Sequence, residues 1–197
     1  MSLRQWLTPA LAAVAVAAVA PAAERGPVEG LPASAVRVVV YEDLQCPDCA
    51  AFRAMLDEKL LPRYGARVAF VHRDFPLAKH AWARRAAVAA RFFYERNPEL
   101  GLRYRRETMA AQRQITAANF ETRLAAFAAA NGVPPAEALA ALGDPRLAAL
   151  VEKDYQEGVA RGISKTPTIL VNGTPFIETF TFEELSKGID QALAEAH

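Results

Sequence analysis

The sequence is poor in cysteine and histidine and nearly balanced in charge, and each shortage excludes a class of protein. Only two cysteines and three histidines occur in 197 residues, and the histidines show no ligand spacing that would complete a zinc site. The formal net charge of +1 does not call for a polyanionic partner. We therefore expect neither a bound metal nor a nucleic-acid partner.

A long hydrophobic run is missing as well. The run at 10–20 is shorter than the ~20 apolar residues that a membrane span requires. It follows a basic residue, Arg4, and ends in small residues that suit signal peptidase cleavage. We interpret residues 1–22 as a signal peptide, with an uncleaved membrane anchor as the alternative. The mature protein is then expected in the periplasm or another extracytoplasmic space.

The two cysteines lie three residues apart in the stretch Cys46-Pro47-Asp48-Cys49. The apolar, β-branched segment before them predicts a buried strand, and the segment after them a helix. Both thiols then lie on the first helical turn, where free N–H groups and the helix dipole stabilise a thiolate. A structural disulfide between residues so close in sequence would stabilise little. The pair is therefore interpreted as a redox-active centre, with Cys46 as the reactive thiol.

The order of expected elements is β-α-β, a helical block, then β-β-α. Strands are expected at 35–41, 67–71, 168–171 and 175–178, and the helices at 46–61, within 78–163, and after Thr181. The first two strands should be parallel. Pro62 is expected to end the first helix, and Glu42 and Asp43 to bring the chain to the surface before Cys46. Thr181 with Glu184 forms a capping-box pattern.

Four stretches carry a family resemblance: YEDLQCPDC at 41–49, RDFPLAKH at 73–80, DYQEGVARG at 154–162 and TPTILVNG at 166–173. Together with the element order, they resemble the DsbA-like branch of the thioredoxin superfamily, exported thiol-disulfide oxidoreductases with a helical domain inserted in a thioredoxin fold. The resemblance covers nearly everything after residue 34. It implies an α/β fold with a mixed sheet.

The resemblance also divides the chain. A linker at 23–34 follows the signal peptide, and the first part of the thioredoxin-like domain is expected at 35–77. The helical insertion is expected at 78–163, and the second thioredoxin-like part at 164–197.

The family assigns roles to four residues. Cys46 is implied as the attacking cysteine and Cys49 as the resolving one. Pro167 is implied as a cis-proline whose loop lies against the disulfide, so that the backbone of Thr166 can pair with an extended substrate. No cofactor is implied.

Four further residues are expected to tune the redox centre: Pro47, Asp48, Glu42 and Lys165. The negative charge of Asp48 opposes a neighbouring thiolate, and Glu42 adds to this. Lys165 would offset part of this charge if it pointed inward. The pKa of Cys46 should then be lowered only moderately.

The acid that thioredoxins bury six residues before the first cysteine is replaced by Val40. Proton transfer to Cys49 must then use water or another group, for which Glu42 is a candidate. His72 and His80 are expected to pack or to cap.

The leading functional hypothesis is a moderate oxidant that donates disulfides to extracytoplasmic proteins with thiols, and that a membrane redox partner resets. The first alternative is a disulfide reductase or isomerase kept reduced by a membrane partner, which Asp48 and Thr166 favour. The second, of another class, is a redox-inert peptide-binding or chaperone module.

Basic residues dominate from Arg63 to Arg123, and acidic residues from Leu124 onward. This pattern has two interpretations. The charges form ion pairs on a solvated surface, or a basic surface attracts acidic partners or membrane headgroups.

Overall fold

A computed structural model describes residues 26–196, so the expected signal peptide lies outside the described residues. Within this part of the chain, five strands form one mixed sheet in the order β1-β3-β2-β4-β5. The strands are β1 (Val28–Gly30), β2 (Arg37–Glu42), β3 (Ala69–Asp74), β4 (Thr168–Val171) and β5 (Thr174–Ile177). As predicted, β2 and β3 are parallel, and β4 and β5 form an antiparallel hairpin.

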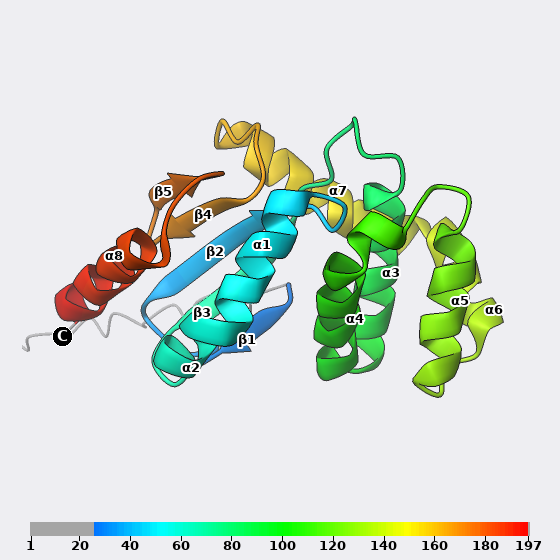
Figure 1. The fold of residues 1–197 in the computed structure, drawn as a ribbon, viewed down its shortest axis with the longest axis horizontal. Coiled ribbons are helices and arrows are strands. Elements are labelled where there is room, and N and C mark those ends of the chain that lie inside the picture. The colour runs from blue at the N-terminus through cyan, green and yellow to red at the C-terminus, as the bar shows by residue number, and fades with distance from the viewer. Residues whose placement is uncertain (1–25, 197) are drawn as a thin grey trace, which may run out of the picture.

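Helices cover the sheet and form a separate layer beside it (Figure 1). They are α1 (Pro47–Met55), η1 (Leu56–Leu60), α2 (Leu61–Tyr64), α3 (Ala83–Arg96), α4 (Pro98–Ala110), η2 (Gln112–Gln114), α5 (Phe120–Ala130), α6 (Pro135–Ala140), η3 (Ala141–Gly143), α7 (Pro145–Ala160) and α8 (Phe182–Glu195). Helices α3 to α6 stand next to the sheet, and α7 leads back to it (Figure 1). This is the predicted thioredoxin-like fold with an inserted helical domain.

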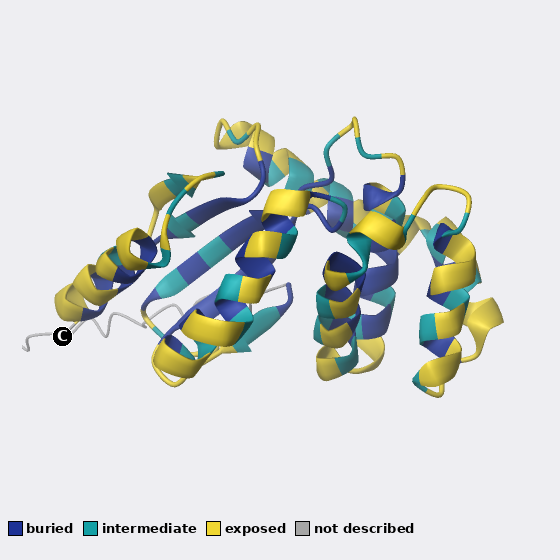
Figure 2. Ribbon diagram, viewed as in Figure 1, coloured by how far each residue is buried: buried dark blue, intermediate teal, exposed yellow. Residues whose placement is uncertain are grey.

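A large apolar cluster lies between the sheet and the helices α1, η1 and α8. Alternate residues of β2, Val38 and Val40, point into it and are fully buried. Phe52, Leu56 and Leu60 enter it from the first helix. Figure 2 shows the alternation of β2 as dark blue and teal bands along the strand. We call this cluster the apolar core.

The prediction that Pro62 ends the first helix is wrong. Helical structure continues to Tyr64, because η1 is a π-helical turn in which the Leu61 N–H donates to the carbonyl of Leu56. The wider turn shifts the hydrogen-bond pattern just before Pro62. The proline then lies in the first turn of α2, where a missing N–H leaves no bond unmade.

The linker prediction is also wrong for the part of 23–34 that the structure describes. Residues Val28–Gly30 form β1, which pairs antiparallel with β3. A side chain at Gly30 would lie 2.3 Å from the carbonyl oxygen of Val68, and Gly30 has φ +83°. Both features require glycine, so the chain before β2 is built into the sheet.

Capping residues set the ends of several helices. The expected capping box of Thr181 and Glu184 is present at the start of α8. The Asn97 side chain accepts from the backbone N–H groups of Glu99 and Leu100. It therefore separates α3 from α4 and starts the insertion's second helix at Pro98.

Candidate active site

Both sulfur atoms lie at the N-terminus of α1. Cys46 is the N-cap residue, Pro47 occupies the first turn, and Cys49 follows in the same turn. Both cysteines are free thiols, and Cys46 is 5% exposed whereas Cys49 is fully buried. Asp48 also lies in this turn, and its side chain is exposed. The spacing therefore places both thiols at one helix start, as the sequence predicts.

The loop before β4 lies against Cys46. The Thr166–Pro167 peptide bond is cis, and the Cys46 thiol lies 3.4 Å from the carbonyl oxygen of Thr166. The Thr166 side chain is buried, and among the described residues its hydroxyl oxygen has no other hydrogen-bond partner. This hydroxyl is therefore free to turn toward the sulfur.

The pKa of Cys46 is lowered to about 6. A hydrogen bond from the Cys49 thiol lowers it most, while burial acts in the opposite direction. The Thr166 hydroxyl and the backbone N–H groups of Cys49 and Asp48 lower it further. Cys46 is thus largely a thiolate at neutral pH, because the helix N-terminus and its neighbours donate to the charged form.

Cys49 has the opposite behaviour. Burial raises the pKa of its thiol well above the usual value, and the adjacent Cys46 sulfur raises it further. The backbone N–H of Asp43 lies 3.4 Å from the Cys49 sulfur and acts in the other direction. One sulfur is therefore prepared as an anion and the other as a thiol.

Asp43 holds together the turn that carries both cysteines. Its carboxylate accepts hydrogen bonds from the backbone N–H groups of Gln45 (2.7 Å) and Leu77 (2.8 Å), and its Oδ2 lies 2.7 Å from Nδ1 of His80. Its backbone carbonyl accepts from the Cys46 N–H. The sequence signal for this role was present, since His80 ends the RDFPLAKH stretch of the resemblance.

The prediction that Glu42 and Asp43 reach the surface is wrong, because they are 2% and 1% exposed. Oε1 of Glu42 lies 2.8 Å from Nη2 of Arg105 and 2.8 Å from Nδ1 of His72. Burial alone would raise the pKa of Glu42, but His72 and Arg105 outweigh it and lower the pKa to about 2. Glu42 makes no hydrogen bond with Cys49 among the described residues. It is a poor proton acceptor for Cys49.

Glu42 belongs to a network of mostly buried ion pairs behind the redox turn. Arg105 joins Glu42 to Asp74 (2.7 Å), and Asp74 also contacts Arg91. His72 lies between Glu42 and Glu29, with its Nε2 2.9 Å from Oε1 of Glu29. The pKa of His72 is raised, because the attraction of these two carboxylates outweighs the effect of burial, which lowers it. We call this network the ionic seam; its members are Glu29, Glu42, Arg53, Asp57, His72, Asp74, Arg91, Arg105, Arg106 and Asp154.

The ionic seam joins the thioredoxin-like part to the insertion. Its members come from β1, β2, β3 and the first helix on one side and from α3, α4 and α7 on the other. The sequence predicts packing or capping for His72, but its charged position between two carboxylates comes from strand pairing. Nothing in the local sequence indicates it.

Lys165 does not point toward the thiols. Its Nζ lies 2.8 Å from Oε2 of Glu178, and its side chain is 58% exposed. Its charge is directed to Glu178 at the surface, which contradicts the expected inward tuning role.

Within residues 26–196, no group of three or more His, Cys, Asp or Glu side chains is arranged to hold a metal. The helices of this part of the chain are also too short or too polar to span a membrane.

Comparison with known proteins identifies the family. The sequence model described as thioredoxin matches residues 22–191, so the chain belongs to the thioredoxin family. No protein with a curated description matches the chain.

The fold is that of the DsbA-like proteins, as the sequence predicts. BdbD from Bacillus subtilis superposes with a TM-score of 0.76 at 24% identity, covering 86% of this chain and 93% of the other. Wolbachia pipientis alpha-DsbA1 gives 0.77 at 18% identity, with 87% and 92% covered. Chlamydia trachomatis DsbA gives 0.72 at 18%, with 86% and 92% covered.

Proposed function

We propose that the protein is a thiol-disulfide oxidoreductase that exchanges disulfides with protein substrates and acts as a moderate oxidant. The observation that carries the proposal is the opposite perturbation of the two thiols. The pKa of Cys46 is lowered to about 6, and the pKa of Cys49 is raised. This is the pattern that a reactive attacking thiolate and a fully buried resolving thiol require. The adjacent cis-proline loop supplies a place for the substrate backbone.

In the oxidising direction the protein begins with a Cys46–Cys49 disulfide. A substrate thiolate attacks the Cys46 sulfur, the disulfide breaks, and Cys49 leaves and takes up a proton because its pKa is high. A second substrate thiolate then attacks the substrate sulfur of the mixed disulfide, and Cys46 leaves as a thiolate. The substrate dithiol is oxidised to a disulfide, and the cysteine pair is reduced to the dithiol.

The lowered pKa of Cys46 favours this direction, because it stabilises the reduced protein. An extended substrate would pair with the backbone of Thr166, which precedes cis Pro167. A membrane redox partner would then reoxidise the pair after each cycle. We place this reaction outside the cytoplasm, because the sequence of residues 1–22 has the pattern of a signal peptide.

A disulfide reductase or isomerase is the second candidate. The pKa of about 6 for Cys46 is closer to the value of about 7 in thioredoxin than to the value of about 3.5 in DsbA. In that direction the Cys46 thiolate attacks a substrate disulfide, and Cys49 resolves the mixed disulfide. A membrane partner would then supply electrons.

The test is the equilibrium of the cysteine pair with glutathione, followed by trapping the free thiols. For a moderate oxidant we expect a reduction potential between about −120 mV and about −180 mV, the values of DsbA and of protein disulfide isomerase. A potential at or above about −180 mV supports the disulfide donor, and one near about −270 mV supports the reductase. A pair that forms no reversible disulfide would leave a redox-inert peptide-binding module. Cys46→Ser is the control, since it cannot form the disulfide.

A further inference from the structure

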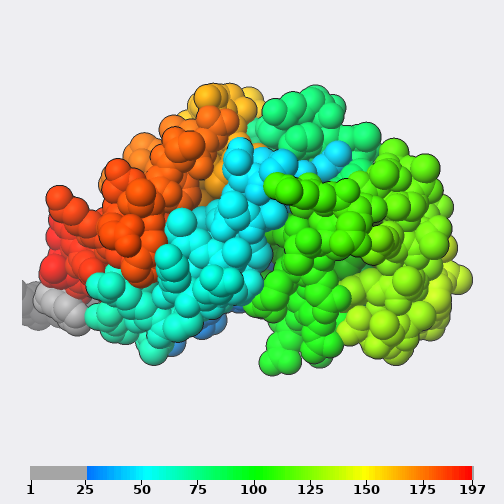
Figure 3. All heavy atoms as spheres, in the orientation of Figure 1, coloured from blue at the N-terminus to red at the C-terminus, as the bar shows by residue number. Residues whose placement is uncertain are grey.

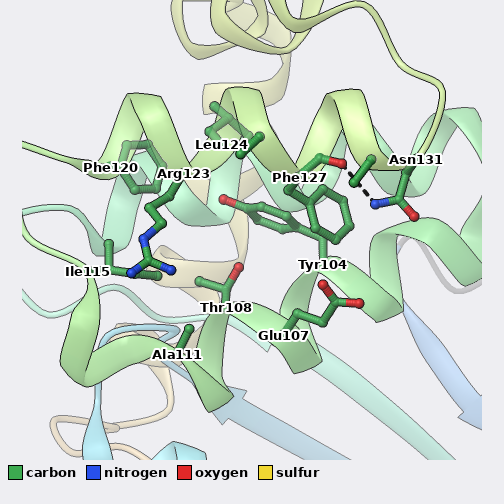
Figure 4. Close-up of a pocket in the computed structure, with 12 residues that line it drawn as sticks. Tyr104, Glu107, Thr108, Ala111, Ile115, Phe120, Arg123, Leu124, Phe127 and Asn131 are labelled. Carbon is green, nitrogen blue, oxygen red and sulfur yellow. Dashed lines mark hydrogen bonds between the residues drawn. The ribbon is translucent and has the colours of Figure 1, made fainter.

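The helical insertion contains a pocket that the proposed chemistry does not use. It lies between α4 and α5 and has a volume of about 220 Å³. Figure 4 shows Tyr104 on one helix and Phe120 and Phe127 on the other, with Ile115 at one end. Tyr104 and Phe120 are almost fully buried, whereas Phe127 and Ile115 are partly exposed. The pocket therefore offers apolar surface to an occupant.

The walls of the pocket are fixed by packing. The rings of Tyr104 and Phe127 meet edge to face at 5.0 Å, and Phe120 stacks on Trp82 at 5.9 Å. Alanines such as Ala126 line the same hollow without filling it. A cavity of about 150 Å³ holds a benzene ring, so this one has room for an aromatic or branched aliphatic side chain. The site is preformed, which reduces the ordering needed for binding.

The arginines around the pocket differ from the other arginines of the insertion. Arg123 lines it and donates to the Gln114 side chain (3.2 Å), and Arg103 donates to Asn131 (2.9 Å), which also lines it. Arg113 lies in η2, between Ala111 and Ile115, which both line the pocket. None of these three has a carboxylate partner among the described residues. Glu107 is the one acidic side chain that lines the pocket.

Elsewhere on the insertion the arginines are paired. Four exposed ion pairs join α3 or α7 to neighbouring elements: Arg84–Glu152, Arg85–Glu121, Arg96–Glu137 and Arg146–Glu95. Among the described residues of the insertion, the arginines without a carboxylate partner are thus gathered around one apolar pocket. An occupant that complements this site carries an apolar group and negative charge.

The pocket is connected to the redox turn. The indole N–H of Trp82 donates to the carbonyl of Ile115 (3.2 Å), and the backbone N–H of Trp82 donates to the Gln45 side chain (2.9 Å). Gln45 directly precedes Cys46. In Figure 3, α1, α4 and α5 follow one another across the same face. A partner that covers this face can contact both the pocket and the redox turn.

We propose that this pocket binds one apolar side chain of a protein partner, in a segment with acidic residues on both sides of that side chain. The apolar anchor fills the hollow, and the acidic residues pair with Arg103, Arg113 and Arg123. A buried anchor with charged neighbours is the common form of a small protein-binding site. The docking does not need the thiols; only its consequence for disulfide exchange rests on the proposed function.

The test uses a fluorescein-labelled peptide without cysteine, in which one Phe has two Asp residues on each side. Binding to the full chain is measured by fluorescence anisotropy at low salt, with Cys46→Ser to prevent any exchange. Two matched peptides replace the Phe by Ala or the four Asp by Lys. We expect saturable binding of the first peptide only.

Two variants test the site, each with a control on the same protein. Ala126→Phe fills the pocket from α5, and Ala129→Phe adds the same ring to an exposed position of α5 that does not line it. Arg123→Glu reverses a charge at the pocket, and Lys187→Glu makes the same change on α8. Loss of an anchor or its charge partner typically weakens binding by about tenfold or more, so we expect that loss for the first variant of each pair only.

The proposal would be overturned if Ala126→Phe or Arg123→Glu bound the peptide as tightly as the protein with an unchanged pocket. Equal binding of all three peptides would overturn it as well. If the peptide does not bind but anionic phospholipid vesicles do, and Arg123→Glu prevents this, the surface binds membranes instead. The glutathione equilibrium of each pocket variant, measured in protein that keeps both Cys46 and Cys49, separates the two proposals. It should be unchanged by a substitution at the pocket, whether or not the peptide binds.

Discussion

The first helix carries two rows of inward-facing side chains, and each row packs against a different region of the protein. Phe52, Leu56 and Leu60 enter the apolar core under α8. Arg53 and Asp57, one position further round the helix, enter the ionic seam and contact Glu29 and Arg106. Cys49 begins the second row, because it lies one turn before Arg53.

The two regions restrain the fold in different ways. Apolar burial is non-directional and tolerates changes in shape. Burying an ion pair removes the solvation of both charges. Their mutual attraction offsets this loss only in a well-defined geometry. The core therefore supplies most of the stability, while the ionic seam fixes the insertion relative to the thioredoxin-like part and to Cys49.

The largest expected effect is the loss of Arg105. Arg105→Met leaves Glu42 and Asp74 buried with one cation fewer, and should lower the free energy of unfolding by about 3–5 kcal/mol. Urea unfolding at pH 7 measures this. Adding Glu42→Gln should recover part of the loss, because a neutral amide no longer leaves a charge unpaired. A double variant less stable than Arg105→Met would contradict our account of the seam.

Acid should weaken the ionic seam before the apolar core. Glu42 and Asp74 have pKa values of about 2 in the fold, against 4.5 and 3.8 ordinarily. Such lowered values stabilise the fold above the ordinary pKa, and this contribution, about 2–3 kcal/mol each, is lost as the pH falls toward 2. Glu42→Gln should make the free energy of unfolding depend less on pH between pH 4.5 and 2. Leu56→Ala, in the apolar core, should lower the free energy of unfolding by the same amount at every pH in this range.

Asp154 should behave in the opposite sense. Burial raises its pKa from 3.8 to about 6, and the neighbouring Asp74 contributes. A raised carboxyl pKa stabilises the fold below pH 3.8, and the contribution is lost as the pH rises to about 6. Asp154→Asn should remove this slope in thermal unfolding measured across the same pH range. An unchanged slope would mean that Asp154 keeps its ordinary pKa.

A smaller effect is expected at Asp43. Asp43→Asn turns an amide N–H₂ toward the Leu77 N–H or His80, and should lower the free energy of unfolding by about 1–3 kcal/mol. Because the turn then holds Cys49 less well against Cys46, the pKa of Cys46 should rise. The pH dependence of alkylation measures this. His80→Ala should act in the same direction, and His80→Asn, which keeps a donor, should restore it.

The smallest effect is expected outside both regions. Lys165→Ala removes an exposed pair with Glu178 and should change the free energy of unfolding by less than about 1 kcal/mol. The pKa of Cys46 and the glutathione equilibrium should stay at their wild-type values, because the ammonium group points away from the sulfur. A shift in either would restore the inward tuning role that the sequence suggested for Lys165.

The sequence alone determined the features that depend on near neighbours. The order of strands and helices from β2 onward, the two thiols on one helical turn and the capping box at Thr181 follow from periodicity and from hydrogen bonds within a few residues. The stretch TPTILVNG also placed Thr166 and Pro167 in a loop before a strand, although the position of that loop against Cys46 required the family resemblance.

Tertiary structure alone decided which charges are buried and what they contact. His72 lies 30 residues from Glu42 and 43 from Glu29, and these distances in sequence leave no local pattern. Val28–Gly30 became a strand because β3 offered an edge, despite glycine and proline nearby. Packing between distant segments buried Glu42 and Asp43, turned Lys165 outward and left the α4–α5 pocket open, because each depends on groups that the chain brings together only when it folds.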